Sequence, residues 1–352
     1  MELNETLRNG LRCSIDYLRF TINSIDLYST LEDFGFSITD FYECPKGADG
    51  YKRMISLQGS SLRVLYDGAE NMGIHFICSG SAVPDLVQYF KEGMMEETPF
   101  GATALDMDIV VVQELLSRIL MTGHITRLDL AIDNMQDIYY RTQELDNIWT
   151  SRRCSAHFRK FKRIIERDSS GKPIGDTVYM GSRSSDLMIR VYDKRLEHNC
   201  KYPENLIEYE WVRWELELKD GRADNAARLL VQQCSVGSVA VGVLSNVFRV
   251  IVFDDSNKSR CSTDIEWQCF IDGIEALRLY TPVPEKTLED KYRWVQRQVG
   301  PTLTGLILAN HGDISWIRDN MSIHAGRMNG SLRSMVAAAN PDWQDVFAEQ
   351  TN

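Results

Sequence analysis

Three segments in the middle of the chain alternate apolar and polar residues, which is typical of strands with one buried face. They are Thr126–Asp133 (TRLDLAID), Leu187–Glu197 (LMIRVYDKRLE) and Val212–Lys219 (VRWELELK). In each segment, aliphatic or tryptophan side chains occupy one face. The other face collects a tyrosine, carboxylates and cations. If the three strands are neighbours in one sheet, their polar faces provide an inventory that suits metal-assisted phosphate chemistry.

The patterns elsewhere predict an α+β fold, an antiparallel sheet with helices on one face. Further strands are expected at Ile15–Asn23, Phe34–Tyr42, Tyr51–Gln58, Leu62–Asp67, Ile74–Ser79, Phe158–Arg167, Thr177–Met180 and, extending the third segment, Glu208–Lys219. Helices are expected at Pro84–Glu92, Asp106–Thr122, Asp137–Arg153 and Ala223–Gln233.

The pattern of apolar and polar residues changes near 221–255, from mainly alternating segments to apolar and helical ones. This change predicts two regions with a boundary there. Residues 14–220 form the expected catalytic domain, and residues 221–352 form a smaller, mainly helical C-terminal region, suited to DNA binding or dimerisation. Within the second region, Val239–Phe253 is apolar and broken by glycine. Helical patterns follow at Asp264–Arg278, Lys286–Val299 and Thr302–Ala309.

Composition excludes several classes of protein. No apolar run approaches the roughly 18–20 residues that a membrane helix needs, so no membrane association is expected. The eight cysteines are scattered and form no Cys-x-x-Cys pair. Reduced thiols and a cytoplasmic location are therefore expected. A net charge of −11 argues against a protein that coats nucleic acid without specificity, although a local basic groove is compatible with it.

One such basic segment spans 152–172, which contains eight lysines and arginines and only two acidic residues. The candidate DNA contacts are Arg159, Lys160, Lys162, Arg163 and, in the glycine-serine turn at 181–185, Arg183. The alternative is a solvated surface hairpin without a ligand, because runs of charge are usually exposed faces.

Tyr192 is the candidate nucleophile. Arg190 and Lys194 share its face of the predicted strand. Cations lower the pKa of a phenol and can hold a phosphate, so these neighbours suit a tyrosine that attacks phosphorus. The same arrangement also occurs on ordinary exposed strands, where tyrosine is a packing residue.

Acidic residues on the other two strands are candidate metal ligands. Asp129 and Asp133 lie about 13 Å apart along one strand, too far for a single ion to reach both easily. Asp129, Glu215 and Glu217 would form an oxygen-rich site that suits Mg²⁺ or Mn²⁺. The alternative is an interstrand lattice in which cations neutralise these acids, namely Arg127, Arg213 and Lys219.

Several motifs are absent. The six histidines form no His-x-His or His-x-x-x-His pair. The sequence also lacks a P-loop, a dinucleotide-binding fingerprint and a Gly-x-Ser-x-Gly elbow, which argues against NTPase activity in this chain.

Taken together, these segments resemble the Rep_trans family, which includes replication initiators of rolling-circle plasmids and relaxases of conjugative transposons. The segments that carry the resemblance are DYLRFTI at 16–22, GIHFICSG at 73–80, RLDLAID at 127–133, YMGSRSSDLMIRVYDKRLE at 179–197 and RWELELK at 213–219. The glycine-serine turn followed by an Ile-Arg-x-Tyr-x-Lys strand is the most specific of them. The family performs the task of the His-hydrophobe-His (HUH) nucleases without their histidine pair.

The resemblance implies a metal-dependent enzyme that nicks one DNA strand at an origin. In this sequence the nucleophile would be Tyr192, which becomes linked to the 5′-phosphate and releases a 3′-hydroxyl. Arg190 and Lys194 would steady the phosphate or the phenolate. Asp129, Glu215 and Glu217 would hold Mg²⁺ or Mn²⁺, with Asp133 a weaker candidate.

The expected partners are origin DNA, single-stranded or in a hairpin at the nick, a host helicase and a second copy of the chain in a homodimer. The resemblance leaves a replication initiator and a conjugative relaxase both open. Two other classes of function also remain open: a non-catalytic origin-binding regulator and a small-molecule phosphoesterase with the same acidic face.

Overall fold

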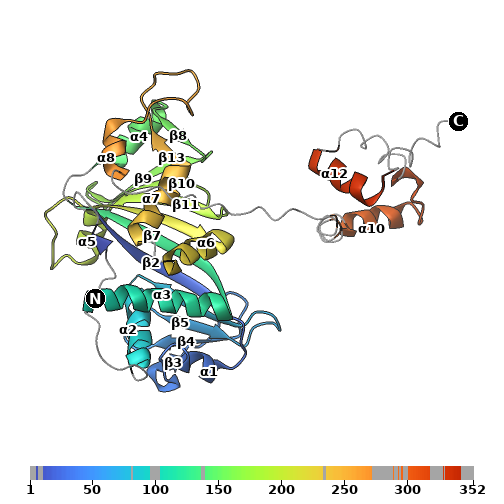
Figure 1. The fold of residues 1–352 in the computed structure, drawn as a ribbon, viewed down its shortest axis with the longest axis horizontal. Helices are drawn as coiled ribbons and strands as arrows, with labels where there is room; N and C mark the ends of the chain where they lie inside the picture. Colours follow the sequence, from blue (N-terminus) through green and yellow to red (C-terminus); the bar gives the residue numbers. More distant parts are fainter. Residues whose placement is uncertain are drawn as a thin grey trace. The chain divides into compact units, whose positions relative to one another are not determined.

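The structure is a computed structural model. It describes residues 5–6, 11–80, 82–95, 104–135, 139–232, 235–271, 288, 292, 295, 300–317, 328 and 330–341. The chain divides into two compact units, Met1–Thr281 and Pro282–Asn352 (Figure 1). Each unit is described by itself.

The first unit is built on one antiparallel sheet of eleven strands. Its strands are β1 (Glu5–Thr6), β2 (Leu11–Ile22), β3 (Phe41–Glu43), β4 (Arg53–Leu57), β5 (Arg63–Tyr66), β6 (Ile74–Ser79), β7 (Gly123–Asn134), β9 (Phe161–Arg167), β10 (Pro173–Gly181), β11 (Leu187–Asp193) and β12 (Val212–Lys219). They lie in the order β3-β4-β5-β6-β2-β7-β12-β11-β10-β9, and β1 pairs with β2. The three segments that the sequence analysis began from, β7, β12 and β11, are therefore direct neighbours. A small sheet pairs β8 (Cys154–Ala156) with β13 (Phe248–Val250).

Helices cover one face of the large sheet. The helices of the first unit are α1 (Leu27–Glu32), α2 (Ala82–Met95), α3 (Ala104–Thr122), α4 (Thr142–Thr150), α5 (Lys194–Lys201), α6 (Asp220–Val231), α7 (Val236–Val247) and α8 (Ile265–Ile271). Figure 1 shows α2, α3, α6 and α7 packed across one side of the strands. The apolar positions of the alternating strands form the core beneath them, as with Leu130, Trp214 and Val191, none of which is exposed. The α+β class with helices on one face is confirmed.

Two boundaries differ from the sequence-based expectations for physical reasons. The segment Leu187–Glu197 is not one strand: β11 ends at Asp193, whose carboxylate accepts a hydrogen bond from Leu196 N (2.9 Å) and caps α5. Aspartate is a preferred N-cap residue, so a helix begins where the alternation seemed to continue. The expected strand at 34–42 is a capped 3₁₀ turn, Ile38–Asp40, followed by the short β3, because Ser37 and Asp40 form a capping box.

The expected C-terminal region is only partly a separate unit. Helices α6, α7 and α8 belong to the first compact unit, so the division at Thr281 falls later than the expected boundary. The apolar segment expected at 239–253 contains most of α7, which is buried nearly all round. In the second unit, the expected helix at 302–309 lies in α10 (Gly300–Ala309), and α12 spans Gly330–Ala339. Most of the expected helix at 286–299, and residues 272–278 of the one before it, lie outside the described residues.

Two expectations from composition can be compared with the structure. Among the described residues, no helix combines the length and the apolar character needed to cross a membrane. The described cysteines are free thiols.

A buried histidine makes folding stability depend on pH. His75 is 7% exposed on β6 and contacts the Thr21 hydroxyl through Nδ1 (2.8 Å). Burial lowers the pKa of His75 from 6.5 to about 4. Between these pH values the unfolded chain binds a proton that the folded chain does not. We therefore expect the free energy of unfolding to fall by about 3 kcal/mol from this group as pH drops from 6.5 to 4.

Urea unfolding at several pH values measures this effect. The His75→Gln variant should lose this part of the acid sensitivity, whereas His157→Gln, at an exposed histidine, should keep it. Equal acid slopes in wild type and His75→Gln would contradict the prediction.

Candidate active site on the polar face of the sheet

The face of the sheet opposite α2, α3, α6 and α7 carries charged side chains from β7, β11 and β12. Side chains of directly paired residues point to the same side of a sheet. Residues that pair directly across these strands are Tyr192 with Arg213 and then Asp133, Arg190 with Glu215, and Glu217 with Asp129. Strand alternation therefore gathers the predicted nucleophile, its arginine and all four candidate acids on one surface.

Tyr192 lies beside Glu215 and Arg190. Its hydroxyl donates to Glu215 Oε1 (2.6 Å), and Arg190 Nε donates to Glu215 Oε2 (2.9 Å). The Arg190 guanidinium carbon is 5.1 Å from the centre of the tyrosine ring. The ring is 6% exposed, yet it is buried among polar groups and lies outside the apolar core under the helices. A phenol, a carboxylate and a guanidinium are thus connected on one surface.

The pKa of Tyr192 shifts in the direction opposite to the sequence-based expectation. Burial raises the pKa of this phenol above its ordinary value, and the charge of Glu215 raises it further, while Arg213 opposes the shift. The sequence argument counted the cations but not the buried carboxylate of Glu215, which accepts a hydrogen bond from the phenol. The hydroxyl is therefore protonated at neutral pH, and it needs a base in order to act as a nucleophile.

Lys194 lies on α5 rather than on the strand. Its ammonium group is 5.5 Å from the centre of the Tyr192 ring and forms an ion pair with Glu197. It therefore remains beside Tyr192 although the strand ends one residue earlier.

The candidate metal ligands are paired with cations. Arg127 donates to Asp129 Oδ1 (2.8 Å) and lies 2.9 Å from Glu217 Oε2, while Lys219 lies 2.7 Å from Glu217 Oε1. Asp133 accepts from Arg213 through both oxygens (2.7 and 2.8 Å). The placed side chains thus form the interstrand lattice that the sequence analysis weighed against a metal site.

Asp129 is deeply buried, with 2% exposure, as is Asp133. Burial raises the pKa of Asp129 to about 7, although the hydrogen bond from Arg127 opposes the shift. Within the part of the chain that the structure describes, no group of three or more His, Cys, Asp or Glu side chains is arranged to hold a metal ion. The residues as placed do not form a metal site, and dependence on Mg²⁺ or Mn²⁺ stays a prediction.

A hollow of about 340 Å³ opens on the polar face of the sheet. Its lining residues are Arg127, Tyr179, Arg183, Met188, Arg190, Glu215, Glu217 and Lys219. Four cations face two carboxylates there, and Arg190 and Glu215 are also the neighbours of Tyr192. The hollow therefore suits an anionic group placed beside Arg190.

Sequence reasoning missed one member of the site, Asp16. Its Oδ1 accepts from Arg213 Nη1 (2.7 Å), and burial, followed by the charge of Glu215, raises the pKa of Asp16. Strict alternation after residue 16 groups Asp16 with the buried Leu18 and Phe20. The pairing of β2 with β7 is irregular between Ile15 and Tyr17, and this bulge leaves Asp16 on the polar face. The signal was present in the sequence, because the apolar positions change from odd to even numbers at this point.

The predicted DNA-contacting residues separate into two groups. Arg159, Lys160 and Lys162 are exposed, and Lys162 on β9 pairs with Tyr179, which lines the hollow. Arg183 is exposed at the rim of the hollow. In contrast, Arg163 donates to Asp176 (2.9 Å) and lies 3.7 Å from Asp146, so its charge is already neutralised within the protein.

Comparison with known proteins identifies the family of this chain. The sequence profile of the Rep_trans family, described as "Replication initiation factor", matches residues 123–319, more than half of the chain. The chain belongs to this family. The Rep_trans match spans β7, β10, β11 and β12, and therefore every candidate site residue except Asp16.

Two relatives extend the Rep_trans match. NicK of Bacillus subtilis (strain 168), which is named as a DNA relaxase, is 26% identical over 315 residues, covering 88% of this chain and 84% of NicK. The rolling circle replication initiator protein from Geobacillus stearothermophilus has a structure similar to this one, with a TM-score of 0.62 and 27% identity. That match covers 77% of this chain and 99% of the initiator. The resemblance drawn from the sequence motifs is confirmed.

Proposed function

We propose that this protein nicks one strand of origin DNA through a covalent phosphotyrosine intermediate. The observation that carries the proposal is the hydrogen bond from Tyr192 to Glu215, beside Arg190 and a hollow lined by cations. A phenol in contact with a carboxylate base, next to a site for an anion, is the arrangement that attack on a phosphodiester needs.

The proposed step is a transesterification. Tyr192 gives its proton to Glu215 Oε1, and its oxygen forms a bond to the phosphorus of the scissile phosphodiester. The bond between phosphorus and the 3′-oxygen breaks, and that oxygen leaves with the electron pair and takes up a proton. The products are a 5′-phosphotyrosine and a free 3′-hydroxyl. Arg190 and Lys194 offset negative charge as it develops on the phosphate.

We also propose that the reaction depends on Mg²⁺ or Mn²⁺, with Asp129, Glu215 and Glu217 as the source of oxygen ligands. The support is the chemistry of the donors, because hard carboxylate oxygens suit these ions. In the structure these oxygens contact Arg127, Arg190, Lys219 or the phenol, so an ion would have to compete with those groups.

The test is incubation of the protein with supercoiled DNA in the presence of Mg²⁺ or Mn²⁺, or of EDTA. The DNA carries the origin of the plasmid or transposon that encodes the protein. Denaturing electrophoresis then looks for protein attached to the 5′ end of the DNA. A covalent adduct that requires the origin supports nicking, and its loss in EDTA supports the metal proposal. A plasmid without the origin is the control.

Two outcomes point to other functions. Origin binding without an adduct favours a non-catalytic regulator. Hydrolysis of generic phosphodiesters without an adduct favours a small-molecule phosphoesterase. The name of NicK supports a relaxase, and that of the Geobacillus protein supports a replication initiator. We also propose a host helicase as a partner, and a second copy of this chain in a homodimer.

Exposed lysines at the β9 edge should contribute to DNA binding through counterion release. We expect the double variant Lys160→Ala/Lys162→Ala to lower the slope of log affinity against log salt concentration by about 1–2. The matched control is Lys46→Ala/Lys52→Ala, because these exposed lysines lie near β3 and β4 at the opposite end of the sheet. Fluorescence anisotropy with origin DNA at several salt concentrations measures both slopes. Equal slopes in the two double variants would remove the β9 edge from the interface.

A further inference from the structure

A cluster of rings lies beside the nucleophile on the segment 202–211, which joins α5 to β12. The ring centres of Tyr209 and Trp211 are 6.4 Å apart with 28° between their planes. His198 on α5 lies 5.0 Å from Tyr202 and 6.5 Å from Trp211. Four aromatic rings thus form one continuous group.

This group continues into the candidate active site through a shared cation. Lys194 Nζ is 6.0 Å from the centre of the Trp211 ring and 5.5 Å from that of Tyr192. The Arg190 guanidinium carbon lies 5.1 Å from the centre of the same Tyr192 ring. Three rings and two cations therefore form one chain of contacts, from Tyr209 through Trp211, Lys194 and Tyr192 to Arg190.

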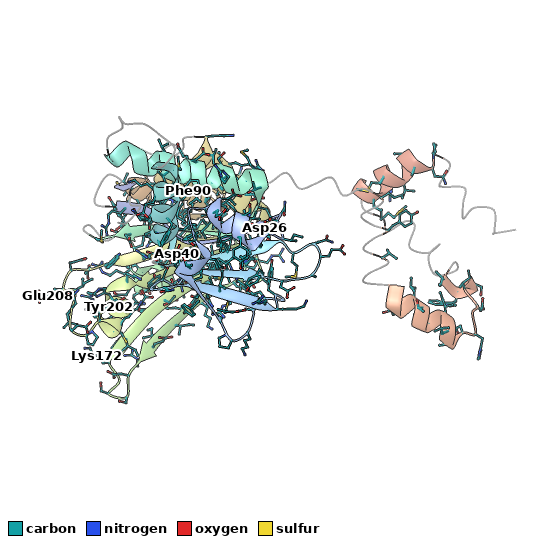
Figure 2. The ribbon with its side chains drawn as sticks, turned by 90° about the horizontal axis from the view of Figure 1, so that it is seen from below. Asp26, Asp40, Phe90, Lys172, Tyr202 and Glu208 are labelled. Carbon is teal, nitrogen blue, oxygen red and sulfur yellow. The ribbon has the colours of Figure 1, made fainter. Side chains whose placement is uncertain are left out.

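Hydrogen bonds hold the segment in place, while Tyr202 and Tyr209 remain exposed and Trp211 is half-buried. The Asn199 side chain donates to Ile207 O (2.9 Å) and accepts from Ile207 N (2.7 Å), and Lys194 N donates to Trp211 O (2.8 Å). Tyr209 remains 52% exposed and Tyr202 40% exposed. Figure 2 shows Tyr202 and Glu208 at the edge of the first unit. Exposed rings on an anchored segment provide a surface for a flat ligand at little conformational cost.

The charges of this segment argue against binding through phosphates alone. The segment itself carries three exposed acidic residues, Glu204, Glu208 and Glu210, and no cation. Arg195 and Lys201 lie outside it on α5, so the segment has no excess of cations. Stacking of nucleobases on aromatic rings needs no such excess, because every base has a flat π-face.

We propose that Tyr209 and Trp211 form a stacking platform for the bases of single-stranded DNA next to the scissile phosphodiester. The proposal rests on the proposed function for the placement of the nick, and it names the form in which the substrate is held. Trp211 is fixed in the platform because its Nε1 donates to Asp133 (2.6 Å). Tyr209 provides the exposed outer ring.

The test measures the affinity for a labelled oligodeoxythymidine strand by fluorescence anisotropy, in EDTA so that cleavage plays no part. The Tyr209→Ala variant should bind roughly 5- to 150-fold more weakly, which is the range for loss of one stacked base. Tyr209→Phe keeps the ring and should bind within about 2-fold of wild type. The control is Tyr42→Ala on β3, which removes a tyrosine of similar exposure (54%) and should leave the affinity for oligodeoxythymidine unchanged.

Two further arms separate stacking from charge. A strand with abasic sugars should bind wild type and Tyr209→Ala equally. The ratio of their affinities for oligodeoxythymidine should stay constant as salt rises, because no counterion release is lost. Equal binding of wild type and Tyr209→Ala to oligodeoxythymidine would overturn the platform, and it would leave these rings as a surface for a protein partner.

This result is distinguishable from a failure of the proposed function. Nicking is scored by the covalent adduct at Tyr192, whereas the platform is scored by equilibrium binding. An adduct in wild type together with unchanged binding in Tyr209→Ala rejects only the platform. Weakened binding in Tyr209→Ala without any adduct in wild type supports the platform and rejects the nicking proposal.

Discussion

Replacing Tyr192 with phenylalanine should abolish the covalent protein–DNA species and lower nicking by at least about 1,000-fold. The variant keeps the ring in its buried position but lacks the oxygen that attacks phosphorus, and loss of a nucleophile removes the covalent route altogether. Denaturing electrophoresis of supercoiled origin DNA measures the adduct and the nick together. Anisotropy with the same origin should show DNA affinity within about 3-fold of wild type, because the cations around the ring remain.

Two neighbours on the same face make this experiment sharper. Tyr17 lies under the Arg127 guanidinium at 4.3 Å, and Tyr179 lines the hollow. The Tyr179→Phe and Tyr17→Phe variants are matched controls, since each removes one hydroxyl from a similar setting, and both should still form the adduct. If the adduct persists in Tyr192→Phe and disappears in one of these controls, the attacking tyrosine lies on β2 or β10 instead of β11. That result would contradict the proposed mechanism.

Where strands pair regularly, the alternating pattern predicted correctly which residues share a face. It placed Arg190, Tyr192, Glu215 and Glu217 on one face because side-chain direction has a period of two and antiparallel pairing preserves it. It failed at Asp16 because a bulge shifts that period by one residue. It also failed to end β11 at Asp193, because an N-cap is a local hydrogen bond that a hydrophobic pattern does not contain.

The pKa of Tyr192 could not be predicted from the sequence, because it depends on which residues lie close together in the folded protein. From the sequence, Arg190 and Lys194 were expected to lower the pKa of the phenol. The pKa of Tyr192 is raised, because burial and Glu215 on the neighbouring strand outweigh the cations. Strand register decides which acid meets the phenol, and it depends on pairing between distant segments. The same limit applies to α7, whose apolar, glycine-broken sequence indicates burial but does not say that it packs against the sheet.

Replacing Arg213 with methionine should lower the free energy of unfolding by about 3–5 kcal/mol. The side chain is 12% exposed and lies between two acids, 2.7 Å from Asp16 Oδ1 and 2.7 Å from Asp133 Oδ1. Methionine fills most of the volume but leaves both carboxylates without their cation, and an uncompensated buried charge costs this much. Urea denaturation at neutral pH measures the change.

A second substitution tests whether uncompensated charge is the cause. The double variant Arg213→Met/Asp133→Asn should be more stable than Arg213→Met, because it removes one of the two stranded carboxylates while the amide oxygen can still accept from Trp211. The control is Arg53→Met, whose ion pair with Glu43 has side chains 51% and 53% exposed and should cost less than about 1 kcal/mol. If Arg213→Met costs no more than Arg53→Met, or if the second substitution lowers stability further, Arg213 does not hold the polar face together through its charge. The lost free energy of unfolding would then come from packing, and other contacts would hold the charged side chains around Tyr192 in place.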